Sequence, residues 1–230
     1  VSLPMMSLAI VAIIYGGLAA IVQDHLYRLI SYTSVSHFGF MVLGIFGGSI
    51  AGASGAMVYM VAHGLSIAGL YLISGFLVRR TGTARLSEMG GIARVSPVIA
   101  GTFLFSALAS IALPGLSGFV PEWLVLTGTF SVSTAAGLFA LLGVVIAALY
   151  ALWPYQKVFT GAPKEKYVGI GDLNKSEKLL VTPLLIAMLA RGLFTAPLTN
   201  LLAEQAELIS AYTGQPGQVS VVLSQGGEAK

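Results

Sequence analysis

Long apolar runs are the feature that most constrains how this chain can fold. Seven of them follow one another in the 230-residue sequence, separated by short polar or glycine-rich segments. A helix of about 20 apolar residues crosses the hydrocarbon core of a bilayer, which is about 30 Å thick. Only 9% of the residues are charged, whereas soluble domains carry about 25%. The sequence therefore predicts an all-α, polytopic transmembrane helix bundle in contact with the lipid bilayer.

The runs are continuous rather than alternating, which excludes a β-barrel. We interpret residues 1–198 as the transmembrane bundle and residues 199–230 as a polar C-terminal tail, partly disordered near its glycine-rich end. The chain begins in an apolar run without a methionine or a signal peptide, so we expect a fragment of a longer protein. The approximate bounds of the seven runs are 3–22, 29–46, 55–78, 95–113, 119–130, 135–153 and 179–198.

A proline- and glycine-rich segment separates the fourth and fifth runs and predicts one broken helix near Pro114–Glu122. If the two runs form one broken crossing, the chain crosses six times. The basic loops 79–94 and 157–178 then lie on the same side, as the positive-inside tendency favours. If the runs cross separately, there are seven crossings and the loops lie on opposite sides. The residues alone leave both arrangements open.

Glu122 follows this break directly and is the most informative ionisable residue. An uncompensated charge inside a bilayer is costly, so such residues mark functional sites. Unwound backbone at a helix break can line a hydrated cavity, where a carboxyl group can bind and release a proton. The alternative is a carboxylate that caps the following helix, with Pro121 fixing the backbone.

Two histidines lie inside apolar runs. His63 could relay protons, because histidine titrates near physiological pH, or it could only bond to a neighbouring helix. His37 ends a hydroxyl-rich stretch that could hold a chain of waters or join two helices. The two could in principle hold a haem between helices, although nothing else in the sequence favours it.

Other charged residues are more ambiguous. Asp24 and Arg28 are four residues apart and could pair on one helical face, or they could mark a loop boundary together with His25. Arg191 lies in an apolar run, where it could extend to the membrane surface or face a partner subunit.

Several classes of site are excluded. The chain has no cysteine, so it holds neither a disulfide nor a thiolate-bound metal. It carries no phosphate-binding or dinucleotide-binding glycine motif, and no histidine and glutamate spacing typical of a metal site. Its basic residues lie in loops between apolar runs, so we expect no nucleic-acid partner. Any redox chemistry is therefore expected in another chain.

Four motifs occur in the order that is typical of one membrane-protein family. The pattern resembles subunit M of bacterial NADH–quinone oxidoreductase (respiratory complex I), which is equivalent to mitochondrial subunit 4. Such subunits are antiporter-like, with 14 helices in two inverted repeats, and this chain is similar to their C-terminal half, helices eight to fourteen. The resemblance thus favours seven crossings over six. The motifs are residues 27–40 (YRLISYTSVSHFGF), 62–66 (AHGLS), 88–91 (EMGG) and 113–122 (LPGLSGFVPE).

The resemblance implies proton translocation across a bacterial inner (plasma) membrane, as a multi-pass subunit of an enzyme complex that oxidises NADH and reduces quinone elsewhere. NAD, FMN, iron–sulfur clusters and quinone would then be bound by partner subunits, with no cofactor in this chain. The implied partners are the other membrane-arm subunits and the missing N-terminal half of the same subunit. The alternatives are a subunit of a multi-subunit sodium/proton antiporter and a structural scaffold that has lost transport.

The resemblance also implies a proton pathway through four residues. Glu122 matches the functional carboxylate of the second broken helix, and His63 matches a histidine of the hydrophilic axis. His37 belongs to the serine-valine-serine-histidine signature. Tyr27 occupies the position of a lysine that links the two half-channels in the family, and tyrosine can hydrogen-bond but cannot supply a cation. Arg191 falls where relatives are usually apolar.

Overall fold

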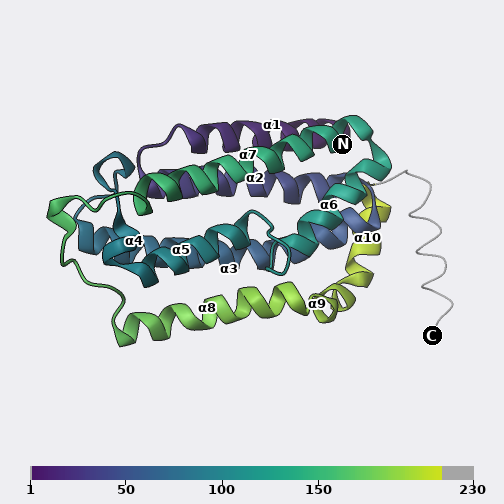
Figure 1. Cartoon of the computed structure of the whole chain (residues 1–230). Coiled ribbons are helices and arrows are strands. Elements are labelled where there is room, and N and C mark those ends of the chain that lie inside the picture. The colour runs from purple at the N-terminus through teal and green to yellow at the C-terminus, as the bar shows by residue number, and fades with distance from the viewer. Residues whose placement is uncertain (1, 214–230) are drawn as a thin grey trace.

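The computed structural model describes residues 2–213, and the long helices of this part of the chain form a bundle along one common axis (Figure 1). The described residues contain no β-strand, only an isolated bridge between His25 and Arg85. The all-α prediction is therefore confirmed. The seven long helices are α1 (Ser2–Ile21), α2 (Leu26–Phe46), α3 (Ile50–Thr81), α5 (Pro97–Ser110), α6 (Phe119–Val132), α7 (Thr134–Phe159) and α8 (Lys175–Leu193).

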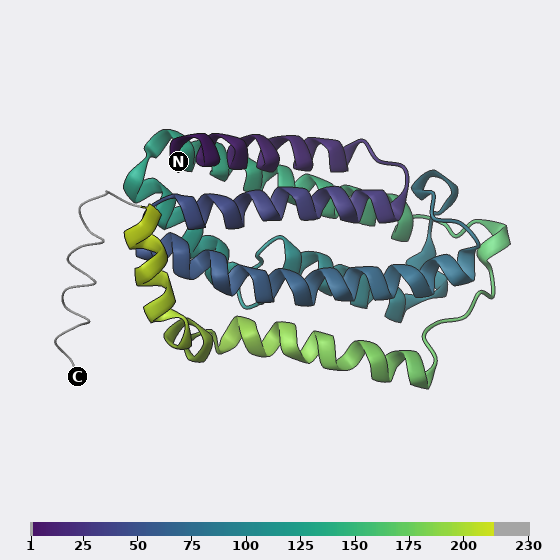
Figure 2. The ribbon, with the colours of Figure 1, turned by 180° about the vertical axis from the view of Figure 1, so that it is seen from behind.

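Among the described residues, four helices are long and apolar enough to cross a membrane: α1, α2, α3 and α7. The helices α5 and α6 are apolar but shorter. Figure 2 shows α1 and α8 at opposite edges of the bundle, with α2 and α3 between them. The short elements are the 3₁₀ helices η1 (Leu86–Glu88) and η2 (Glu165–Tyr167), and the helices α4 (Ile92–Val95), α9 (Ala196–Leu201) and α10 (Ala203–Thr213).

Local signals set the ends of the helices. Ser49 caps α3 by accepting a hydrogen bond from the Gly52 N–H, and α3 ends at Gly82, whose φ of 70° is left-handed. Asn174 begins α8 with a capping box, in which its side chain and that of Glu177 each accept a bond from the other's backbone N–H. These residue types predict helix ends from the sequence alone.

The helices α5 and α6 follow one another along α3 and form one broken crossing. A Cβ at Gly55, near the start of α3, would lie 2.8 Å from the Pro121 carbonyl oxygen of α6. A Cβ at Gly69 would lie 2.8 Å from Ser106 Oγ of α5. These two glycines are about 21 Å apart along α3, because a helix rises 1.5 Å per residue. The seven apolar segments therefore make six crossings, and the expectation of seven crossings is wrong.

The break itself explains why the two runs share one crossing. The chain leaves the helical conformation after Ser110 and turns through Ala112 (φ 58°) and Gly115 (φ 90°). It then resumes as α6 in the same general direction (Figure 1). A break of this length shifts the helix sideways without reversing its direction. The residue pattern alone could not decide whether the direction is kept or reversed.

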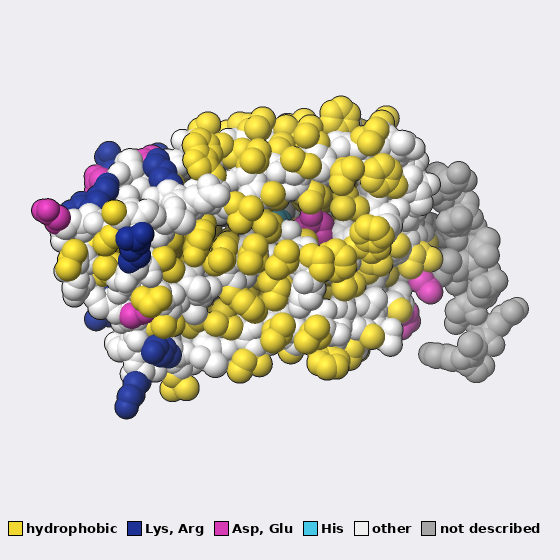
Figure 3. Space-filling model, viewed as in Figure 1, with side chains coloured by type: hydrophobic (Ala, Val, Ile, Leu, Met, Phe, Trp, Pro, Cys, Tyr) yellow, Lys and Arg dark blue, Asp and Glu magenta, His cyan; other side chains and the backbone are white. Residues whose placement is uncertain are grey.

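The six crossings bring three loops to one end of the bundle. The backbone N–H of Leu86 donates to the Asp24 carbonyl at 2.7 Å, and the Gly91 N–H donates to the Thr160 carbonyl at 2.9 Å. Figure 3 shows lysines and arginines gathered at this end, beside a broad band of hydrophobic side chains. We call it the basic end, comprising residues 23–28, 79–94 and 157–178. Both predicted basic loops therefore lie on one side.

Small residues allow the closest helix contacts. A Cβ at Gly16 of α1 would lie 2.7 Å from the Ser36 backbone nitrogen of α2. A Cβ at Gly39 of α2 would lie 2.8 Å from the Ala9 carbonyl oxygen of α1. Glycine at such positions lets the backbones of membrane helices approach each other. The contact between α1 and α2 fixes the position of the α2 face that carries His37.

The last predicted run ends earlier than expected. Helix α8 ends at Leu193, and α9 begins at Ala196 with Pro197 in its first turn. The segment 199–213, expected to be the start of a polar tail, is mostly helical. Helix α10 packs against α3 and α2 at the end opposite the basic end. The glycine-rich end of the tail lies outside the described residues, and the division of the chain at residue 198 stays a prediction.

Candidate functional site

Glu122 lies in the first turn of α6, directly after the helix break, and only 3% of it is exposed. Its backbone N–H donates to the Gly118 carbonyl at 3.2 Å, which is an ordinary helical bond. Its carboxylate is not bonded to the backbone of that turn, and the helix N-cap has no side-chain bond. Instead, Glu122 Oε2 accepts a hydrogen bond of 2.5 Å from the Tyr59 hydroxyl of α3. The geometry disfavours the helix-cap alternative.

A continuous chain of side-chain hydrogen bonds leads away from Glu122. The Tyr59 hydroxyl lies 2.8 Å from Nδ1 of His37 on α2, and Nε2 of His37 lies 3.0 Å from the Tyr150 hydroxyl on α7. We call Glu122, Tyr59, His37 and Tyr150 the buried relay. Tyr59, His37 and Tyr150 are each 1% exposed. Four helices thus contribute one titratable group each to a single line.

His63 lies beside the buried relay. Its ring centroid is 5.0 Å from that of His37, and the Phe38 ring packs against it at 5.5 Å. His63 is 5% exposed, and its Nδ1 atom is buried without a hydrogen-bond partner among the described residues. Because buried polar atoms are normally bonded to protein or to ordered water, this nitrogen is a place where a water or another donor fits.

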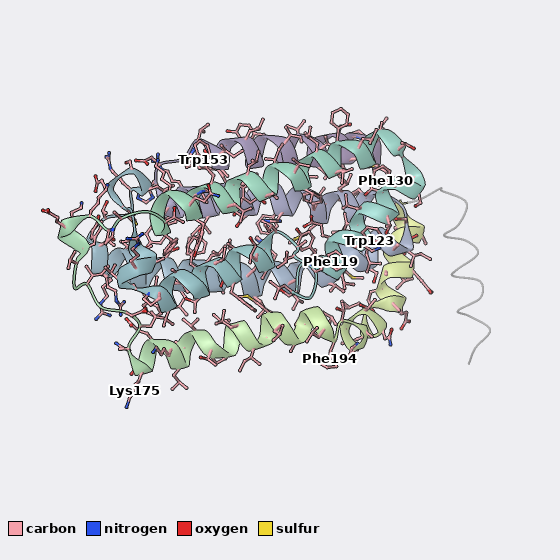
Figure 4. All side chains as sticks on the ribbon, in the orientation of Figure 1. Phe119, Trp123, Phe130, Trp153, Lys175 and Phe194 are labelled. Carbon is pink, nitrogen blue, oxygen red and sulfur yellow. The ribbon has the colours of Figure 1, made fainter. Side chains whose placement is uncertain are left out.

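Cavities adjoin both ends of the buried relay. One of about 20 Å³ adjoins Tyr150 and is lined by the hydroxyl residues Thr33 and Ser110 as well as by apolar side chains, which leaves room for about one water. One of about 160 Å³ adjoins Glu122, between α6 and α7. Figure 3 shows acidic and histidine side chains at the bottom of a hollow in the middle of the apolar face. Phe119 and Trp123, labelled in Figure 4, line the cavity beside Glu122.

The structure brings three of the four predicted site residues together. Glu122, His37 and His63 converge, whereas Tyr27 does not. Tyr27 lies ten residues before His37 on α2, which is about 15 Å along the helix axis. Its ring stacks on that of Tyr71, with the centroids 6.1 Å apart.

Sequence reasoning missed Tyr59 and Tyr150. Tyr59 lies four residues before His63 on α3, so the two side chains share one helical face. A polar group placed one turn from a predicted site residue is a signal that could have identified Tyr59. No comparable signal marks Tyr150, because α7 contains neither a histidine nor an acidic residue.

Asp24 is held by the loop 79–94 and not by Arg28. Its carboxylate accepts bonds from the Ser87 N–H (2.9 Å) and the Ser87 hydroxyl (2.5 Å), and from Lys157 Nζ at 3.3 Å. The Ser87 hydroxyl is the main reason that the pKa of Asp24 lies below its ordinary value of 3.8. Helix α2 begins only at Leu26, so Asp24 and Arg28 share no helical face. The predicted pairing on one face is wrong, and the loop-boundary interpretation holds.

Arg191 is half-buried near the C-terminal end of α8. One guanidinium nitrogen donates to the Phe194 carbonyl at 3.5 Å, and another is buried without a partner among the described residues. Its neighbour Gly192 abuts the helix break, where a Cβ would lie only 2.2 Å from the Gly115 carbonyl oxygen. Arg191 therefore lies on the helix that packs over the break.

The described residues contain no group of three or more histidine, aspartate or glutamate side chains that could hold a metal ion. The buried relay instead consists of a carboxyl, an imidazole and two phenols that are joined by hydrogen bonds. What it can do chemically is pass a proton along its line, because each hydroxyl or imidazole in it can both donate and accept.

The model of the NADH:quinone oxidoreductase/Mrp antiporter transmembrane family matches residues 1–148 of this chain. NADH-quinone oxidoreductase subunit M of Mycobacterium tuberculosis is 44% identical over 209 residues, which are 91% of this chain and 38% of that protein. Subunit M of Rhodobacter capsulatus is 37% identical, and the match covers 93% of this chain and 42% of that protein. The chain thus spans about two-fifths of the length of these curated relatives.

Solved structures are also similar to this chain. A chain of respiratory complex I from Thermus thermophilus with bound NADH matches with a TM-score of 0.88 and 32% identity, over 93% of this chain and 45% of that chain. A chain of the Mrp complex from Dietzia sp. DQ12-45-1b matches with a TM-score of 0.80 at 20% identity, over 95% of this chain and 48% of that chain, and shows the shared fold alone. These matches and the apolar helices make this a multi-pass protein of the bacterial plasma membrane. The chain belongs to the NADH:quinone oxidoreductase/Mrp antiporter transmembrane family, within which it is a relative of bacterial subunit M.

Proposed function

We propose that this chain translocates protons as part of the membrane arm of an NADH–quinone oxidoreductase, with Glu122 as the group that binds and releases the proton. The observation that carries the proposal is the buried relay: a carboxyl, an imidazole and two phenols joined by hydrogen bonds of 2.5–3.0 Å inside an apolar bundle. Ionisable groups are rare at such depth and mark ion pathways. The 44% identity to a subunit M supports the same assignment.

The redox chemistry belongs to other subunits in this proposal. Iron–sulfur clusters are held mainly by cysteine thiolates, and the chain has no cysteine. NAD, FMN and quinone are likewise assigned to partner subunits, and the other membrane-arm subunits are the proposed partners. The chain then takes part in an enzymatic complex without performing electron transfer itself.

We infer the orientation of the bundle in the membrane from the charges of its basic end. Lysines and arginines close to membrane helices are more frequent on the cytoplasmic side. The basic loops meet at one end of the bundle (Figure 3), so this end faces the cytoplasm in our proposal. The cavity beside Tyr150 includes Leu29 and Pro154 and therefore lies on the basic side of the relay. The cavity beside Glu122 lies at the helix break.

The proposed mechanism is a change in the proton affinity of Glu122. Buried in the apolar bundle, its carboxylate has no cation within salt-bridge distance among the described residues. Its equilibrium between the ionised and the protonated form is therefore sensitive to charges that change elsewhere in the complex. Protonation and release on alternate sides of the relay would then move one proton across.

The test is Glu122→Gln in the complete complex, assayed in inverted membrane vesicles that oxidise NADH. Proton uptake and electron transfer are recorded together, and assembly is verified. We expect proton uptake per electron to fall in an assembled complex. The matched control is Glu204→Gln, which removes an exposed carboxylate from α10 and is expected to change nothing.

The same assay separates the alternative functions. Unchanged pumping in an assembled Glu122→Gln complex contradicts the proposed role of Glu122 and favours a structural scaffold. Sodium-dependent proton flux in the absence of NADH favours a subunit of a sodium/proton antiporter.

A further inference from the structure

The geometry points to Tyr59 as the proton-transfer group between His37 and Glu122, a role that rests on the proposed function and adds a named residue to it. The Tyr59 hydroxyl lies 2.8 Å from His37 Nδ1 and 2.5 Å from Glu122 Oε2. The structure shows no direct hydrogen bond between His37 and Glu122. The phenol oxygen is therefore the link that joins the imidazole to the carboxylate.

The surroundings of Tyr59 fix its ring in this bridging position. The residue is 1% exposed. Its ring contacts that of His37 edge-on at 5.7 Å and that of Phe40 at 6.4 Å. A buried phenol between packed aromatic rings has little freedom except rotation of its O–H bond. That rotation is the movement that a relay requires.

The hydrogen bonds have a defined direction. An ionised carboxylate only accepts hydrogen bonds, so Tyr59 donates to Glu122. The phenol oxygen can then accept from Nδ1–H of His37. In neutral His37 the other nitrogen, Nε2, accepts from the Tyr150 hydroxyl. All three bonds therefore point from Tyr150 towards Glu122.

The transfer step balances in protons and charge. A hydronium ion in the adjoining water transfers a proton to the Tyr150 oxygen and becomes neutral water, while the original hydroxyl proton of Tyr150 moves to His37 Nε2 and makes His37 an imidazolium. The Nδ1–H bond then breaks and its proton forms an O–H bond on Tyr59. The original Tyr59 O–H bond breaks at the same time, and its proton forms an O–H bond on Glu122 Oε2. His37 ends neutral with its proton on Nε2, both tyrosines keep one proton, and Glu122 is protonated.

His63 does not offer an equivalent path. Its Nδ1 atom has no partner among the described residues, and no hydrogen bond joins its ring to Glu122. Its ring lies beside that of His37, with 5.0 Å between the ring centroids, so a positive charge on His63 would act on the buried relay. The link to the carboxylate still passes through Tyr59.

The first test is Tyr59→Phe, which removes the bridging oxygen and keeps the ring. In the complete complex we expect proton uptake per electron to fall as far as it does in Glu122→Gln. The matched control is Tyr71→Phe, a hydroxyl on the same helix that bonds Ser31 outside the relay, for which uptake is expected to be unchanged. Normal pumping by Tyr59→Phe overturns the inference. If Glu122→Gln also pumps normally, the proposed function fails instead.

A second test separates proton transfer from packing and keeps the phenol in place. Tyr59 is replaced by fluorotyrosines of increasing acidity, with Tyr71 replaced in parallel. If the hydroxyl proton is transferred, the rate of proton uptake and its pH profile change in step with the acidity of the phenol at position 59 only. A rate that is the same across the series contradicts the role of Tyr59, even if Tyr59→Phe fails to assemble.

Discussion

Glu122 and Glu177 are two carboxylates with similar burial and different partners. They are 3% and 5% exposed, respectively. Glu177, at the basic end, forms an ion pair with Arg80 through both of its oxygens and accepts the Asn174 N–H. Glu122, in the centre, accepts a hydrogen bond from the neutral Tyr59. Burial alone thus does not distinguish the proposed proton carrier from a carboxylate in a structural ion pair.

The difference between the two partners decides what each carboxylate can do. Arginine stays protonated in proteins, so Glu177 has a permanent counter-charge and remains ionised. The buried relay around Glu122 contains no such fixed charge. A proton is then the charge that this site can gain or lose. The identity of the hydrogen-bond donor therefore separates a structural ion pair from the proposed exchange site.

The largest effect on stability is expected where the fixed counter-charge is removed. Glu177→Gln leaves Arg80 half-buried without its anion, although Arg80 keeps its bond to the Asp172 carbonyl at 2.9 Å. Breaking a buried pair costs about 3 kcal/mol. The matched change Glu122→Gln is expected to cost under about 1 kcal/mol, because the amide oxygen still accepts from Tyr59.

Denaturant or thermal unfolding of the purified protein in detergent measures both changes. The double change of Arg80→Met with Glu177→Gln should recover part of the lost stability, because no buried charge remains unpaired. Equal losses for the two glutamate substitutions would remove the distinction between a paired and an exchangeable carboxylate.

The second-largest effect on stability is expected in α8, the helix that connects the region of Glu177 with the region of Glu122. Its first turn carries Glu177, and its Gly192 abuts Gly115 in the break that precedes Glu122. Gly192→Ala places a Cβ 2.2 Å from the Gly115 carbonyl oxygen, so we expect a loss of about 2 kcal/mol and a change in pumping. The control is Gly101→Ala on α5, where a Cβ meets no atom within 4 Å.

Unfolding curves and vesicle proton uptake are the measurements for this pair of variants. Gly101→Ala is expected to be neutral or slightly stabilising, because alanine favours a helix over glycine by up to about 1 kcal/mol. A Gly192→Ala protein as stable and active as the parent would show that α8 does not constrain the break.

The smallest effect is expected at Asp24, a charge of the basic end that is 44% exposed. Its pKa is lowered on folding, chiefly by the Ser87 hydroxyl. The stabilisation is therefore present above the ordinary pKa of 3.8 and is lost as the pH falls through the lower pKa of the folded state. Exposure and salt screening keep it under about 1 kcal/mol.

Asp24→Asn tests this sign. The variant should unfold at a slightly lower temperature than the parent at pH 7, and the difference should disappear as the pH falls below 3.8 and through the lower pKa of Asp24 in the folded state. A difference that grows in acid would contradict the assignment of the Ser87 and Lys157 contacts as stabilising interactions of the ionised form.

Much of the architecture could be predicted from the sequence because apolar length and helix signals act locally. The bounds of α6 agree with the predicted fifth run to within two residues at its C-terminal end, and the break after Ser110 follows from Pro114 and its neighbouring glycines. The structure brings Glu122, His37 and His63 of the predicted site together, and their role in proton transfer stays a prediction. Glu122, His37 and His63 are recognisable because a polar group within an apolar run needs an explanation wherever it lies in the fold.

Only the tertiary structure decided how these segments meet. Tyr59 and Tyr150 are 91 residues apart in the sequence, yet both bond the ring of His37. A tyrosine is half apolar and fits any membrane helix, so its role depends on the neighbour that its hydroxyl reaches. Tyr27 is the converse case: its role is predicted from its position in a motif, its height on α2 places it at the basic end, and the role stays a prediction. The sequence by itself determined a helical membrane protein with a broken helix and a buried carboxylate. Helix packing decided that residues 2–213 make six crossings and that Glu122 faces a phenol and not a cation.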